Sequence, residues 1–208
     1  DRFGVKPLYF TNSRNFFRFG STLQSIIVKN DIDLAFDEKS LHFHFSLHAV
    51  VPAPDTLFKN IKKVPPGCYL TIDENKKISI IQYWKLESPE QKNIITNENE
   101  ATEIIEHLLK ESIEKRLSAS DIDVGVLLSG GLDSSMVVAL AKEKFPNLKT
   151  FSIGFEDDKE EKGNEFIYSD QVVEKYKTDH KKFIIDNTLV LSKLPKAFEA
   201  MSEPMLAQ

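Results

Sequence analysis

The pattern of hydrophobic and polar positions changes near residue 86. Before that point the apolar residues form short runs rich in β-branched and aromatic side chains, which are typical of strands, and turn sequences such as "PPG" separate them. The strands predicted in this half are "PLYF" (7–10), "CYLTID" (68–73) and "KISIIQYW" (77–84), the last two joined by a hairpin turn at "ENK".

One helix is predicted to interrupt these strands, over residues 37–48. Asp37 is a residue type that caps helices, and Leu41, Phe45 and His48 recur at helical spacing. The same stretch, "HFHFSLH", contains three histidines. A helix would bring only His44 and His48 to one side, and no acidic or sulfur ligand stands at a suitable offset, so we expect no metal here.

Helical and strand patterns alternate in the second half. This alternation predicts an α/β domain with a parallel, doubly wound sheet. The predicted helices are 101–117, 132–145, 165–177 and 188–201, the last interrupted by Pro195, and the predicted strands are 123–129, 148–155 and 180–186.

A polar stretch, "LESPEQKNIITNENE" (86–100), separates the two patterns. We therefore predict a first domain over residues 1–86, a linker over 87–100 and a second domain over 101–208. The strongly charged "EDDKEEKGNE" (156–165) is predicted to be a solvated, mobile loop of the second domain.

Composition excludes several classes of protein. The 208 residues carry a net charge of −5, from 27 basic and 32 acidic residues, and no basic stripe suggests a nucleic-acid partner. No apolar run approaches the roughly 20 residues of a membrane span, and the single cysteine cannot form an internal disulfide. We expect a cytoplasmic protein. The chain opens without Met and closes where a loop should continue, which indicates truncation at both ends.

The stretch "VLLSGGLDSSM" (126–136) combines an apolar strand, a Gly-Gly turn and a helix. Such a turn can present backbone N–H groups to a phosphate, and the helix N-terminus and serine hydroxyls would add to the attraction. The lysine of the common ATP-binding loop is absent. Asp133 would repel phosphates unless a cation lies between them, so it predicts Mg²⁺. Alternatively, Asp133 and Ser134 are only helix caps and the glycines only a turn.

This loop closely resembles the pyrophosphate-binding loop of ATP pyrophosphatase-type synthetases. Together with "DRFGVKPLYF", "TLFKNIKKVPPGCYL", "QYW" and "LKTFSIGF", it makes nearly the whole chain similar to glutamine-dependent asparagine synthetases. The resemblance implies the C-terminal part of an α+β N-terminal-nucleophile glutaminase sandwich. A synthetase domain of the adenine nucleotide α-hydrolase type, with a doubly wound parallel sheet, would follow it.

The resemblance implies a reaction in two halves. Glutamine is hydrolysed to glutamate and ammonia, a carboxylate such as aspartate attacks the α-phosphate of Mg-ATP with release of pyrophosphate, and ammonia then displaces AMP. Two groups of residues match ATP-binding positions of the family. Ser129, Gly130, Gly131, Leu132, Asp133 and Ser134 match the pyrophosphate loop, with Asp133 also contacting Mg²⁺, and Leu127 and Ile153 match positions lining the adenine pocket.

The glutaminase nucleophile of this family is a cysteine at the mature N-terminus, whereas residue 1 here is Asp1. Cys68 follows "PPG" inside a strand-like run and is predicted to be a buried structural cysteine. The sequence therefore contains no catalytic nucleophile, and we expect this chain alone to be inactive.

The acceptor carboxylate stays open. Stretches such as "LPKAFEAMSEPM" look more like N-acetylglutaminylglutamine amidotransferase, which acts on a small peptide carboxylate, than like a plain asparagine synthetase. A non-catalytic nucleotide-binding module is the alternative from another class. The expected partners are small molecules, namely ATP, glutamine and aspartate or a peptide carboxylate; a homodimer is left open, and neither nucleic acid nor a membrane is expected.

Overall fold

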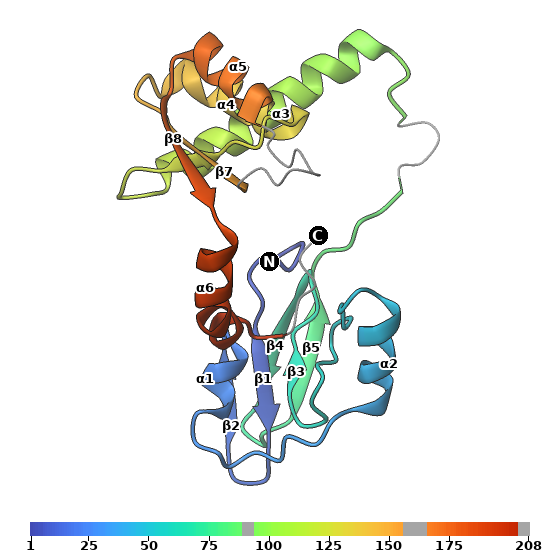
Figure 1. Cartoon of the computed structure of the whole chain (residues 1–208). Helices are drawn as coiled ribbons and strands as arrows, with labels where there is room; N and C mark the ends of the chain where they lie inside the picture. The colour runs from blue at the N-terminus through green and yellow to red at the C-terminus, as the bar shows by residue number, and fades with distance from the viewer. Residues whose placement is uncertain (89–93, 156–165, 204–208) are drawn as a thin grey trace. The chain divides into compact units, whose positions relative to one another are not determined.

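The computed structural model describes residues 1–88, 94–155 and 166–203 (Figure 1). The chain forms two compact units. Asp1–Ser88 and Leu194–Gln208 make up the first, which we call the β-rich unit, and Pro89–Lys193 make up the second, the parallel-sheet unit. The predicted mobile loop, 156–165, lies outside the described residues. Among those residues, no helix is both long and apolar enough to cross a membrane.

The β-rich unit contains a three-stranded antiparallel sheet and a separate hairpin. In the sheet, β1 (Tyr9–Asn12) lies between β2 (Phe17–Gly20) and β3 (Lys62–Lys63). The hairpin pairs β4 (Cys68–Ile72) with β5 (Ile78–Gln82), which confirms the predicted turn at "ENK". The sequence pattern missed β2, whose residues "FRFG" form too short a run for a period-two signal.

Two helices complete this unit. The predicted helix is α2 (Glu38–Ser46), and the Asp37 side chain caps it by accepting a hydrogen bond of 2.8 Å from the Ser40 N–H. The predicted apolar face is wrong, because Phe45 is 82% exposed and His48 lies beyond the helix end with a positive φ. The residue of α2 that faces inward is instead Ser40, which is fully buried.

The short helix α1 (Leu23–Ile27) was not predicted, yet it supplies two of the four residues in the unit's buried hydrophobic cluster. Thr22 caps its N-terminus, and Leu23 and Ile26, three residues apart, bury the same side of the helix. They pack with Tyr9 of β1 and with Ile61.

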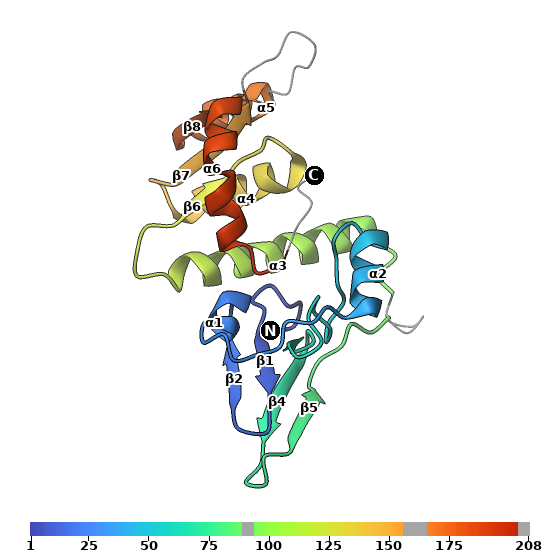
Figure 2. The same ribbon diagram turned by 60° about the horizontal axis from the view of Figure 1, so that its bottom comes forward.

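The parallel-sheet unit confirms the predicted alternation. Its three strands are parallel and adjacent in chain order (Figure 2). The strands are β6 (Gly125–Leu127), β7 (Lys149–Phe155) and β8 (Asp179–Ile185), and the helices are α3 (Glu98–Ser118), α4 (Leu132–Lys144) and α5 (Phe166–Tyr176). The Asn97 side chain caps α3 by accepting hydrogen bonds from two backbone N–H groups of its first turn.

The two faces of β7 differ in side-chain size. Thr150, Ser152 and Gly154 are buried, and their small size lets α4 and α5 pack closely against the sheet. From Phe151 onward the alternate positions carry large apolar residues, of which Ile153 and Phe155 are more than half exposed. In the described residues, helices therefore cover one face of the sheet, and its core is formed by Leu128, Val138, Ala141 and Leu148.

Helix α6 (Asn187–Ala200) follows β8 without the predicted interruption. Pro195 lies inside it, and the helix continues on both sides. A proline removes one backbone N–H from the hydrogen-bond ladder, and the remaining bonds hold the helix together. The division between the two units falls within α6, at Leu194.

Candidate functional site

The stretch 128–131 connects β6 to α4, at the carboxyl end of a parallel strand. Ligands of open parallel sheets bind beyond such strand ends. Leu128 anchors the start of the loop, since its side chain is 1% exposed and its N–H donates to the Phe151 carbonyl of β7. The next residues, Ser129 and Gly131, are exposed. The loop is thus fixed at its base and open at its tip.

The N-terminus of α4 has no side-chain cap. Gly131 is the N-cap residue, and the first N–H that bonds along the helix is that of Ser135, at 3.0 Å from the Gly131 carbonyl oxygen. The N–H groups of the first turn precede this bond, and no described residue accepts a hydrogen bond from them. Together with the helix dipole, they form a site that favours anions.

The serines of the loop hold one another. The Ser129 and Ser134 hydroxyls lie 3.0 Å apart, the Gly131 N–H donates to Ser129 Oγ, and the Ser134 hydroxyl donates to the Gly131 carbonyl. Neither Asp133 nor Ser134 is the N-cap, so the reading of both as helix caps is wrong. The Ser134 hydroxyl proton is therefore directed to the loop's own Gly131 carbonyl.

The two glycines of the loop have different surroundings. Gly130 has a φ of +91°, and a Cβ there would lie 2.6 Å from the Tyr168 Cβ and 2.7 Å from the Ser169 backbone nitrogen, both in α5. Gly131 has a φ of −68°, and a Cβ there would meet only Ser129 Oγ, at 3.4 Å. Gly130 is therefore required by the packing of the loop against α5, whereas Gly131 faces open space.

Asp133 lies in the first turn of helix α4, and it is exposed. Within the described part of the chain, no group of three or more His, Cys, Asp or Glu residues could hold a metal ion by itself. A single carboxylate beside a phosphate site still suits Mg²⁺, because this ion is usually held by one or two carboxylates together with substrate phosphates. Asp133 fits that role.

The two predicted adenine-pocket residues lie on the same face of the sheet, opposite the helices. Leu127 ends β6 and is 71% exposed, and Ile153 of β7 is 57% exposed. Phe183 of β8 pairs with Ile153 in the strand register and is also more than half exposed. Phe183 was not among the predicted site residues, although the alternation of small and large residues in β7 could have indicated which face is apolar.

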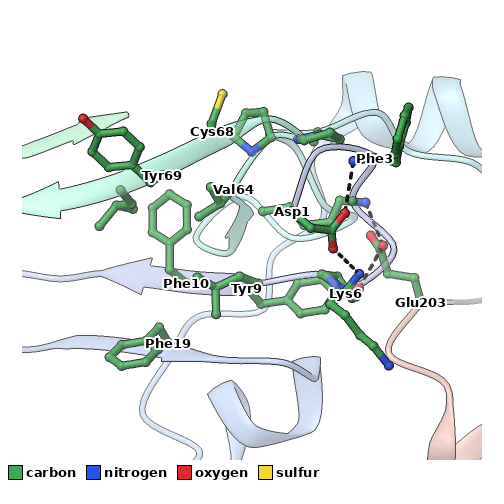
Figure 3. A pocket seen from close by; sticks show the side chains of 18 of the residues that line it. Asp1, Phe3, Lys6, Tyr9, Phe10, Phe19, Val64, Cys68, Tyr69 and Glu203 are labelled. Carbon is green, nitrogen blue, oxygen red and sulfur yellow. Dashed lines mark hydrogen bonds and ion pairs between the residues drawn. The ribbon is translucent and has the colours of Figure 1, made fainter. Parts of the chain in front are cut away.

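The β-rich unit contains a cavity of about 720 Å³ (Figure 3). Phe10, Phe19 and Tyr69 line its apolar part. Cys68 lies at this cavity and is only partly buried, so the prediction of a buried cysteine is wrong. Glu203 also lines the cavity.

Comparisons with known proteins match two successive parts of the chain. Residues 104–208 match the family described as asparagine synthase, and residues 1–84 match the family described as glutamine amidotransferase domain. The chain is 39% identical over 157 residues to asparagine synthetase [glutamine-hydrolyzing] 1 of Bacillus subtilis, which covers 75% of this chain and 24% of that protein.

Two further relatives show the spread of the similarity. Asparagine synthetase [glutamine-hydrolyzing] 3 of Bacillus subtilis is 30% identical over 219 aligned positions, covering 100% of this chain and 35% of that protein. Amidase chry2 of Gibberella zeae is 34% identical over 143 residues, covering 67% of this chain and 20% of that protein. The chain thus spans about a quarter to a third of the length of the synthetases it matches, and it belongs to the asparagine synthase family.

Proposed function

We propose that the full-length protein is a glutamine-dependent amidotransferase of the asparagine synthetase type. It uses ATP to activate the side-chain carboxylate of aspartate as an acyl-adenylate, and ammonia from glutamine displaces AMP. The support comes from the names of the relatives and from the loop after β6. The domain limits predicted above, 1–86 for the glutaminase part and 101–208 for the synthetase part, are included in this proposal.

The observation that carries the proposal is an exposed Gly-Ser loop that leads into an uncapped helix at a parallel strand's carboxyl end. Free N–H groups at that position stabilise negative charge on the departing pyrophosphate. No lysine lies in the loop to accompany a transferred terminal phosphate, and this favours cleavage between the α- and β-phosphates.

The residues of this chain have separate roles in the proposed site. Gly131 and the first-turn N–H groups of α4 receive the pyrophosphate part of ATP. Ser129 and Ser134 hold the loop in shape through their mutual hydrogen bonds. Asp133 holds Mg²⁺, which would neutralise charge on the phosphates. Leu127 and Ile153 offer an apolar face to the adenine ring.

Pyrophosphate release from Mg-ATP by the full-length protein tests the proposal. With aspartate and an ammonium salt, Asp133→Asn should reduce release by at least roughly ten-fold, while glutamine hydrolysis stays within about two-fold of wild type. Asp123→Asn is the matched control, since Asp123 precedes β6, at the opposite strand end, and pairs with Lys149. The proposal fails if the wild-type protein releases no pyrophosphate with any carboxylate. If pyrophosphate is released only with a peptide carboxylate, that carboxylate replaces aspartate as the proposed acceptor.

A further inference from the structure

The segment after α6 is held on the β-rich unit by two kinds of mutual capping. Gln24 of α1 donates through Nε2 to the carbonyls of Glu199, in the last turn of α6, and Met201, the residue after that helix, at 2.9 and 2.6 Å. In return, Ser202 Oγ accepts a hydrogen bond of 3.1 Å from the Leu23 N–H at the start of α1. Each helix end thus satisfies backbone groups of the other.

The next residue, Glu203, is received by two residues distant in the sequence. Lys63 Nζ of β3 lies 2.8 Å from Glu203 Oε2, and the Tyr9 hydroxyl of β1 donates to the same oxygen at 3.3 Å. Lys63 also donates to the Val51 carbonyl, which fixes its position. The side chains of Lys63 and Glu203 are 14% and 17% exposed, so the pair is shielded from solvent.

Because the Lys63–Glu203 pair is shielded, the loss of one partner should matter more here than in a surface ion pair. Exposed pairs contribute little, but removal of one partner of a shielded pair leaves an uncompensated charge. Tyr9 is 4% exposed and belongs to the core with Leu23 and Ile26. The segment 199–203 is therefore joined to the core of the β-rich unit.

The segment 199–203 is also connected, through the chain itself, to the parallel-sheet unit. The segment is the end of α6, which starts directly after β8, a strand of the parallel sheet that carries the proposed nucleotide loop. An enzyme that makes ammonia in one domain and uses it in another must avoid losing ammonia to water. There it is protonated, and ammonium has no lone pair with which to attack an acyl-adenylate.

On this basis, and resting on the proposed function, we propose that the joint formed by Tyr9, Lys63 and Glu203 couples glutamine hydrolysis to amide formation. Glu203 is a positioning residue in this role: it acts through α6 and touches no substrate. The quantity it governs is the amount of amide formed per glutamate released, rather than the rate of either half-reaction.

The experiment uses the full-length protein and compares Glu203→Gln with wild type. Glutamine hydrolysis without ATP, and pyrophosphate release with an ammonium salt, should each stay within about two-fold, because neither needs transfer of ammonia between domains. The amide formed per glutamate should fall several-fold. Gln24→Ala removes the hydrogen bonds to Glu199 and Met201 without leaving a buried charge, and it should lower the same ratio if Glu203→Gln fails to fold.

Asp55→Asn is the matched control, because Asp55 pairs with Lys62 and Lys39 within the same unit but not with the segment 199–203. It should leave the ratio unchanged. The inference is overturned if both joint variants keep the wild-type ratio, or if Asp55→Asn lowers it equally. If wild type releases no pyrophosphate even with ammonium, the proposed function fails first and the inference falls with it. If wild type releases pyrophosphate and the joint variants keep the wild-type ratio of amide to glutamate, the inference is refuted and the proposed function stands.

Discussion

Replacement of Gly130 by alanine should destabilise the parallel-sheet unit through two separate effects. The φ of +91° is unfavourable for any residue with a Cβ, at about 1–2 kcal/mol. The new Cβ would also overlap the Tyr168 Cβ and the Ser169 backbone nitrogen, at 2.6 and 2.7 Å. Because backbone atoms cannot rotate away, α5 must shift, which costs about 1–3 kcal/mol. The expected loss is about 2–5 kcal/mol.

Gly131→Ala is the control in the same loop. Its φ of −68° suits alanine, and its Cβ would meet only Ser129 Oγ, at 3.4 Å. Alanine is a poorer N-cap residue than glycine, by up to about 1 kcal/mol. The lower entropy of the unfolded chain offsets about 0.4–1 kcal/mol of this. The net change in the free energy of unfolding should therefore stay below about 1 kcal/mol.

Urea unfolding distinguishes the two variants. Circular dichroism follows α3, α4 and α5, whereas fluorescence follows Trp84, the chain's one tryptophan, which belongs to the β-rich unit. With a urea dependence of about 2 kcal/mol per molar, Gly130→Ala should lower the midpoint of the helical transition by roughly 1–2.5 M. Gly131→Ala should leave it nearly unchanged. Equal midpoints would refute the packing of Gly130 against α5.

Three further predictions concern single side chains. Burial, and secondly Lys182, hold the pKa of His180 below its ordinary value of 6.5. Because the unfolded state then binds the proton more readily, the free energy of unfolding should fall as the pH drops through about 6.5. Urea midpoints at several pH values should show this fall in wild type and not in His180→Asn. Burial, and secondly the charge of Glu203, raise the pKa of Tyr9 to about 12 from 10. This shift corresponds to about 2.7 kcal/mol of folding stability, which solvent screening reduces to about 1–2 kcal/mol. Wild type should lose this stability between pH 10 and 12 and Tyr9→Phe should not, as followed by tyrosinate absorbance and unfolding. Val138 is fully buried in α4, and Val138→Ala should lower the free energy of unfolding by about 2 kcal/mol in the same urea experiment.

The sequence predicted the parallel-sheet unit better than the β-rich unit, and the reason is the length of the elements. The predicted helices 101–117, 132–145 and 165–177 differ from the observed ones by a few residues at most, because each repeats the helical period over several turns. By contrast, α1 has five residues and β2 has four, too few for any period to show. Tertiary packing decides such short elements: Leu23 and Ile26 form a helix face only because the sheet offers them a core. Cytoplasmic location and a homodimer remain predictions.

The sequence predicts where the candidate site lies, but not which role each of its residues has. A strand, two glycines and a helix start are local features, so "SGGLDSS" locates the loop from the sequence alone. The separate tasks of Gly130 and Gly131 depend on Tyr168 and Ser169, nearly forty residues later, and no local pattern reveals that α5 packs there. From the sequence alone, both glycines are interpreted as serving the ligand. In the structure, one serves the fold, and this leaves Gly131, with the free N–H groups of α4, as the surface on which ATP affinity should depend. Gly131→Ala should therefore weaken ATP binding while the protein stays folded, whereas Gly130→Ala should lose binding only as far as the unit unfolds.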